Sequence, residues 1–80
     1  MYTDEMRKAF RSIEAPQGFY VDIADEDHFL TVIAKEDVFM RLDDFGKRRA
    51  IEYLARVKKA LEDAGAIVLL VREGGKDEYS

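Results

Sequence analysis

Residues 29–34 read Phe-Leu-Thr-Val-Ile-Ala, an apolar run with β-branched side chains near the middle of the chain. Such short runs, bounded by polar breaks, are typical of β-strands. The breaks here are residues 25–27, Asp-Glu-Asp, and residues 35–37, Lys-Glu-Asp. Because the run is apolar at almost every position, we expect a strand that presents apolar side chains on both faces of a sheet.

Alternating patterns flank this run on both sides. In residues 19–24, Phe-Tyr-Val-Asp-Ile-Ala, the first, third and fifth positions are large and apolar, which is the period of a strand. Residues 38–42, Val-Phe-Met-Arg-Leu, repeat the alternation and predict a third strand with Val38, Met40 and Leu42 turned inward. The breaks between these segments are short, so we expect the three strands to form an antiparallel meander.

Two segments have helical spacing. Thr3 is suited to cap a first helix, and the next residues, Asp4 and Glu5, favour its positive end. A longer helix begins after Asp43 or Asp44 and ends before Gly65. The apolar stripes that these helices turn towards the core are Met6, Ala9, Phe10 and Ile13 in the first, and Ala50, Tyr53, Leu54, Val57, Leu61 and Ala64 in the second.

The last apolar segment, residues 67–71, is apolar on both faces and predicts a strand inside the sheet. The expected order is therefore α-β-β-β-α-β. This order predicts an α+β domain with a four-stranded, mainly antiparallel sheet and both helices on one face. We expect residues 1–73 to form this single domain and residues 74–80 to be a flexible tail.

Composition favours a folded domain: 48% of the 80 residues are hydrophobic and 38% are charged. The chain has no cysteine, which fits a reducing compartment. Residues 1–5 are acidic and lack the pattern of a signal peptide. The longest apolar run, residues 66–71, is too short to span a bilayer. We therefore expect a cytoplasmic location without membrane contact.

The densest group of candidate ligands is Asp25, Glu26, Asp27 and His28. Carboxylates with an imidazole can hold a divalent cation, but a calcium loop starting at Asp25 would place Phe29 and Leu30 where an oxygen ligand and a glycine belong. His28 is the only histidine, and no serine or cysteine nucleophile is placed to use it as a base. We expect a solvated turn, no metal or other cofactor and no catalytic activity, with a small metal-dependent enzyme or sensor as the alternative.

Basic side chains gather on the longer predicted helix. Residues 45–64 carry six basic and three acidic side chains, although the whole chain has a net charge of −4. The basic residues of its outer face could follow a phosphate backbone: Arg48, Arg49, Arg56 and Lys59. Glu52 and Asp63 share that face at i, i+4 spacing, which is typical of a solvated helix. Nucleic-acid binding is therefore the alternative hypothesis, and we expect none at physiological salt.

The favoured hypothesis follows from the two-faced apolar strands. Two helices can cover only one face of the sheet, so the other face should carry apolar and aromatic side chains. Large exposed patches of this kind mark interaction sites. The anchors we predict on the helix-free face are Tyr20, Phe29, Ile33 and Phe39. We expect a non-enzymatic protein-interaction module that binds a protein partner or a second copy of itself, since small domains gain stability from association.

Overall fold

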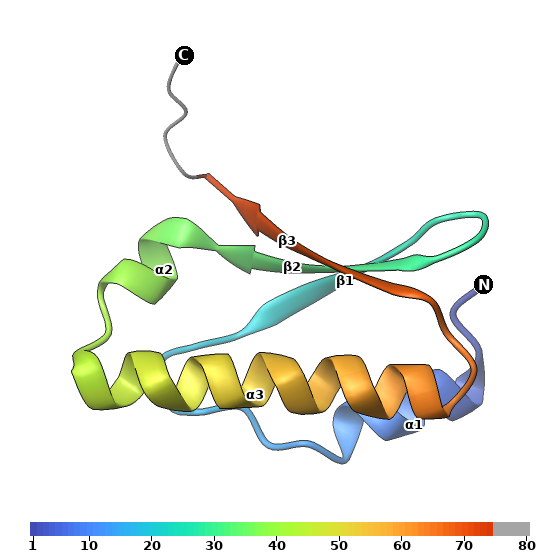
Figure 1. Cartoon of the computed structure of the whole chain (residues 1–80), viewed down its shortest axis with the longest axis horizontal. Coiled ribbons are helices and arrows are strands. Elements are labelled where there is room, and N and C mark those ends of the chain that lie inside the picture. Colours follow the sequence, from blue (N-terminus) through green and yellow to red (C-terminus); the bar gives the residue numbers. More distant parts are fainter. Residues whose placement is uncertain (75–80) are drawn as a thin grey trace.

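The computed structural model describes residues 1–74 of the 80. In this part of the chain three helices and three strands follow one another in the order α-β-β-α-α-β (Figure 1). Their bounds are α1 Asp4–Arg11, β1 Val21–Asp25, β2 Leu30–Lys35, α2 Glu36–Met40, α3 Asp44–Asp63 and β3 Val68–Glu73. The α+β class expected from the sequence is confirmed.

The strands form one mixed sheet in the order β1-β2-β3. β1 and β2 are antiparallel and place Ile23 opposite Val32. β2 and β3 are parallel and place Val32 opposite Leu70. Parallel neighbours need a long crossover, because the chain must return to the starting end of the sheet. α2 and α3 make this return.

The ends of α1 and α3 follow from local chemistry. The Thr3 side chain accepts a hydrogen bond from the backbone N–H of Met6, at 3.1 Å, and so caps α1. Asp43 accepts one from the backbone N–H of Gly46, at 2.7 Å, and caps α3. Gly65 follows α3 with φ of +104°, a left-handed conformation that favours glycine.

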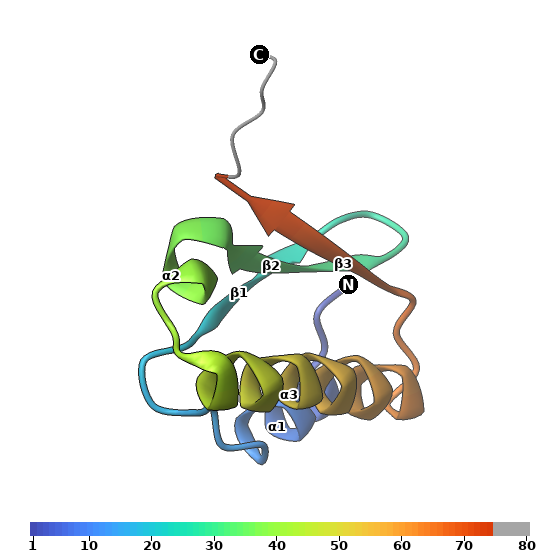
Figure 2. The same cartoon turned by 60° about the vertical axis from the view of Figure 1, so that its left-hand side comes forward.

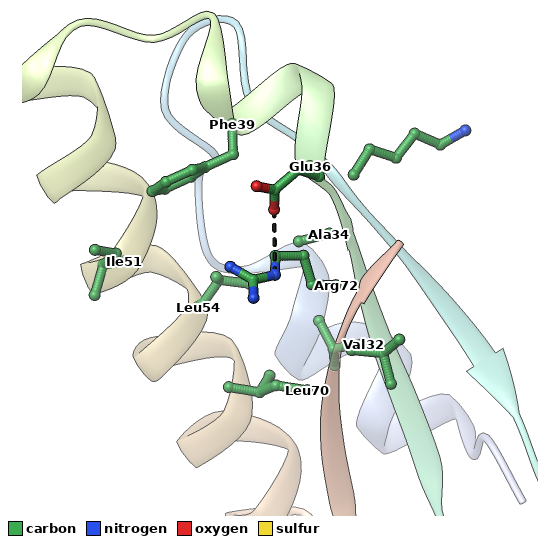
Figure 3. Close-up of a pocket in the computed structure, with 10 residues that line it drawn as sticks. Val32, Ala34, Glu36, Phe39, Ile51, Leu54, Leu70 and Arg72 are labelled. Atoms are coloured by element: carbon green, nitrogen blue, oxygen red, sulfur yellow. Dashed lines mark ion pairs between the residues drawn. The ribbon is translucent and has the colours of Figure 1, made fainter. Parts of the chain in front are cut away.

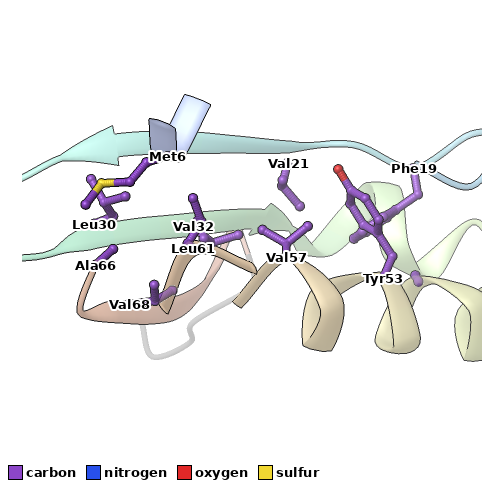
Figure 4. Packing of buried hydrophobic residues seen from close by; sticks show 11 residues of the cluster. Met6, Phe19, Val21, Leu30, Val32, Tyr53, Val57, Leu61, Ala66 and Val68 are labelled. Carbon is purple, nitrogen blue, oxygen red and sulfur yellow. The ribbon is translucent and has the colours of Figure 1, made fainter. Parts of the chain in front are cut away.

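The core lies between the sheet and the helices. Figures 1 and 2 show α1 and α3 on the same side of the sheet, with α2 at the end of β2. Alternate residues of the strands point into this layer, as Val32 and Val68 do. Figure 4 shows the buried cluster that results. Its members are Met6, Phe19, Val21, Leu30, Val32, Ala50, Tyr53, Val57, Leu61, Ala66 and Val68.

The strand predicted at residues 38–42 is wrong, because residues 36–40 form helix α2 instead. Met40, which the strand pattern turns inward, is 55% exposed. Val38, Phe39 and Leu42 pack against the core, and their i, i+1, i+4 spacing is that of one helix face. Glu36 and Asp37 lie in the first turn, where negative charge is favourable.

The predicted sheet is also corrected. Within residues 1–74 it has three strands and not four, and it combines one antiparallel with one parallel pairing. β3 lies at an edge of the sheet and not inside it, because it pairs with β2 alone among the described strands. The apolar run at residues 67–71 therefore remains largely exposed, with Ile67 at 66%.

Two further expectations concern the C-terminal tail and the membrane. Apart from Gly74, the tail predicted at residues 74–80 lies outside the described residues. Within residues 1–74, none of the helices has the length and apolar character needed to cross a membrane.

Candidate functional site

The most unusual surface of the molecule is the exposed apolar strand β3. Leu69, Leu70 and Val71 are 49%, 46% and 39% exposed, although they are consecutive apolar residues of one strand. Side chains alternate along a strand, so Leu70 lies on the helix side of the sheet and its two neighbours lie on the other side. β3 is thus apolar and accessible on both faces. Such a strand at a sheet edge is a template for pairing with another chain.

The outward backbone groups of β3 can be assigned from its ladder with β2. The backbone N–H of Leu30 donates to the carbonyl of Ile67 at 2.8 Å. The direction of the backbone amide groups alternates along a strand. The backbone N–H and C=O groups of Leu69 and Val71 therefore also point towards β2. The N–H and C=O groups of Val68, Leu70 and Arg72 point the other way. We call this row of outward groups the β3 edge.

The other edge of the sheet has a different character. β1 carries Asp22 and Asp25 within its five residues, and both side chains are exposed. Charged side chains on an edge strand discourage pairing with another strand. The first four residues of β3 carry no charge, so of the two edges of the sheet in residues 1–74 the β3 edge is the one with an apolar surface.

The helix-free face of the sheet is defined by the residues that alternate with the core positions. The registers of the sheet place Ala24, Thr31 and Leu69 in one row across the strands, and Asp22, Ile33 and Val71 in the next. Thr31 is buried in the middle of this face, whereas Leu69 and Val71 are exposed where it meets the β3 edge. The apolar part of this face therefore continues into the β3 edge.

A hollow of about 400 Å³ adjoins the β3 edge on the helix side (Figure 3). Its apolar wall comes from β2, α2, α3 and β3, through Val32, Ala34, Phe39, Ile51, Leu54 and Leu70. Ile51 and Leu70 are 58% and 46% exposed, so the outer wall of the hollow is apolar and accessible. The volume is within the range of small ligand pockets.

The polar end of the hollow is an ion pair. Arg72 Nε lies 3.2 Å from Glu36 Oε1, which joins β3 to the start of α2 (Figure 3). That carboxylate oxygen is buried and has no hydrogen-bond partner among the described residues, so its contact with Arg72 is an ion pair without a hydrogen bond. Arg72 is 75% exposed, so water screens the attraction.

The predicted interface residues are not all in one place. Ile33 lies on the helix-free face, beside Val71. Tyr20 and Phe29 immediately precede β1 and β2, with Tyr20 52% exposed. Phe39 is not on an outward strand face. It lies in α2, and its ring packs edge-on against Phe19 with centroids 6.3 Å apart. Its role as an interface anchor stays a prediction.

The basic residues of α3 are spread along an exposed surface. Arg48, Arg49, Arg56 and Lys59 are all exposed. Lys59 Nζ lies 3.6 Å from the Asp63 carboxylate, and Lys58 Nζ lies 2.7 Å from that of Glu62. The Arg49 guanidinium lies 5.6 Å from the centre of the Phe45 ring. No observation here favours nucleic acid over a solvated helix face, and that function stays an alternative.

Asp25 is the last residue of β1 and residues 26–28 belong to the turn between β1 and β2, and all four residues are exposed. The Asp25 carboxylate accepts hydrogen bonds from the Met1 amine and, at 3.0 Å, from the backbone N–H of Tyr2. The hydrogen bond from the amine is the main reason why the pKa of Asp25 is lowered. Among residues 1–74 no group of three or more histidine, aspartate or glutamate side chains could hold a metal ion.

Sequence reasoning missed the β3 edge and the hollow. Both depend on strand order and on α2, which the alternating pattern assigned to a strand. Comparison of the chain with models of known protein families, with curated proteins and with solved structures gave no match.

Proposed function

We propose that this chain is a protein-interaction module that binds its partner by strand addition at the β3 edge. The observation that carries the proposal is the exposure of three consecutive apolar residues, Leu69, Leu70 and Val71, in an edge strand. In strand addition the outward backbone groups supply directional hydrogen bonds, and alternate side chains supply selectivity. Both components are available here on the same six-residue strand.

The neighbouring apolar surfaces extend this interface. On one side of β3 the partner covers the helix-free face near Ile33 and Val71, and Tyr20 and Phe29 immediately precede the other two strands, at opposite ends of the sheet. On the other side it covers the hollow beside Leu70. Aromatic and aliphatic side chains of this kind contribute most when an interface excludes water from them. The proposed function is therefore recognition of a protein partner.

Site-specific photo-crosslinking tests this function. A photoreactive amino acid replaces Leu70 in one variant and Lys59 in a matched variant, since both positions are exposed and lie on different surfaces. We expect a discrete protein adduct in cells from position 70 and none from position 59. Equal adducts from both positions, or none from position 70, would contradict the proposal.

A further inference from the structure

We infer that the partner at the β3 edge is a second copy of this chain, paired antiparallel about Leu70. The two three-stranded sheets would then join into one continuous sheet. This inference rests on the proposed function, because it names the occupant of the same edge. It also gives the association closed two-fold symmetry, the commonest arrangement of soluble oligomers.

The backbone of β3 is self-complementary in this register. A two-fold axis at Leu70 places that residue opposite its own copy, and Val68 opposite Arg72. These are the three residues whose N–H and C=O groups point away from β2. Directly opposed residues with outward groups form the hydrogen-bonded pairs of an antiparallel ladder. Each of the three residues would therefore exchange both of its backbone hydrogen bonds with the other copy.

The side chains also match in this register. Residues directly opposite each other in an antiparallel pair lie on the same face of the sheet. Leu69 of each copy therefore meets Val71 of the other on the helix-free face. The two Leu70 side chains meet on the helix side, next to the hollow and to the exposed Ile51. Every exposed apolar side chain of β3 itself finds an apolar partner.

Charge favours β3 as the place where two copies meet. The chain has a net charge of −4, so two copies carry net charge of the same sign and repel each other overall. β3 carries only Arg72 and Glu73, whose charges cancel, and both lie away from the axis at Leu70. The β1 edge, with Asp22 and Asp25, would instead place like charges close together.

The pairing must also bury enough surface. A specific association buries at least about 1,000 Å² in total, or roughly 500 Å² from each copy. This is about one-tenth of the 5514 Å² of accessible surface, and the exposed residues of β3, with the adjoining Ile51, are where that area would come from.

The decisive experiment uses the absence of cysteine from the natural chain. Opposed residues in a hydrogen-bonded pair have Cα atoms about 5.5 Å apart, which is within the range of a disulfide. We expect Leu70→Cys to form a disulfide-linked dimer rapidly under mild oxidation. Ile67→Cys is the matched control, because Ile67 is more exposed but lies about 20 Å from its own copy in this register.

The outcomes separate the alternatives. Collision between free molecules would link Ile67→Cys at least as fast as Leu70→Cys, and that result would overturn the inference. Sedimentation equilibrium of the natural chain, from micromolar to near-millimolar concentration, should approach twice the 9.2 kDa chain mass. Leu70→Lys should raise the dissociation constant of the dimer at least about tenfold, because the substitution removes one buried leucine side chain from each copy. Phe45→Lys is the matched control, because Phe45 is also an exposed apolar residue but lies outside the proposed interface, and it should change the dissociation constant little.

A dimer that Ile33→Lys disrupts and Leu70→Lys does not would place the contact on the helix-free face and contradict the register. Circular dichroism of each variant confirms that it is folded. A chain that stays monomeric at all concentrations overturns the inference. In that case an adduct with a different protein from position 70 would still support the proposed function, whereas the absence of any adduct would contradict both.

Discussion

Replacing Leu61 by alanine tests the packing of α3 against the sheet. Leu61 has no exposed surface and belongs to the central cluster, so its truncation leaves a cavity. Such substitutions cost about 2–5 kcal/mol. An 80-residue domain has a total stability of about 4–12 kcal/mol, so the loss is a large fraction of it. At roughly 4–8 °C for each kcal/mol, the melting temperature should fall by about 10 °C or more.

Met40→Ala is the matched control, because it also removes a long apolar side chain. Met40 is 55% exposed on α2, so its truncation should change the stability by less than about 0.5 kcal/mol. Urea unfolding followed by circular dichroism, at low micromolar concentration, measures both variants. A loss below about 1 kcal/mol for Leu61→Ala would refute the packing. A loss for Met40→Ala as large as that for Leu61→Ala would mean that Met40 points inward, as a strand at residues 38–42 requires.

Three further substitutions test local features. Asp43→Ala removes the side chain that caps α3 at Gly46 and should cost about 1 kcal/mol in urea unfolding, while Asp43→Asn should cost clearly less. Gly65→Ala should destabilise the fold by about 1 kcal/mol or more, because φ at this position is +104°. The added Cβ would lie 3.9 Å from Met6 Cε, so the cost comes from the backbone conformation and not from a clash. An unchanged urea midpoint would contradict the left-handed conformation. Burial raises the pKa of Tyr53 above its ordinary value of 10.0, so the unfolded chain loses that proton at lower pH than the folded chain. Stability due to this group is therefore complete below pH 10 and is lost as the pH rises through the folded-state pKa. Tyr53→Phe should make the alkaline loss of stability smaller, and parallel pH profiles for the two proteins would refute this.

Part of the candidate site was predictable from local pattern. Two-faced apolar segments at residues 29–34 and 67–71 predict more apolar sheet surface than two helices can cover. Ile33 does lie on the helix-free face, next to Val71. Phe39 was misplaced, because a residue in α2 obeys the helical period and not the alternation of a strand. The hollow that Phe39 helps to line was therefore not predictable either.

The sequence by itself determined the elements whose signals are local: α1 and α3 with their caps, β1 with its alternation and β2 with its short apolar run. Residues 36–42 fit both the alternation of a strand and the spacing of a helix, and the segment is too short for the pattern to distinguish them. The helix α2 is the conformation that packs this segment against Phe19 and the core. The position of β3 in the sheet likewise depends on the tertiary structure. The sequence pattern shows which side chains are apolar, but it does not give the order of the strands. That order depends on the place to which the crossover returns the chain. Here α2 and α3 return it to the edge of the sheet, so the run expected inside became an exposed strand.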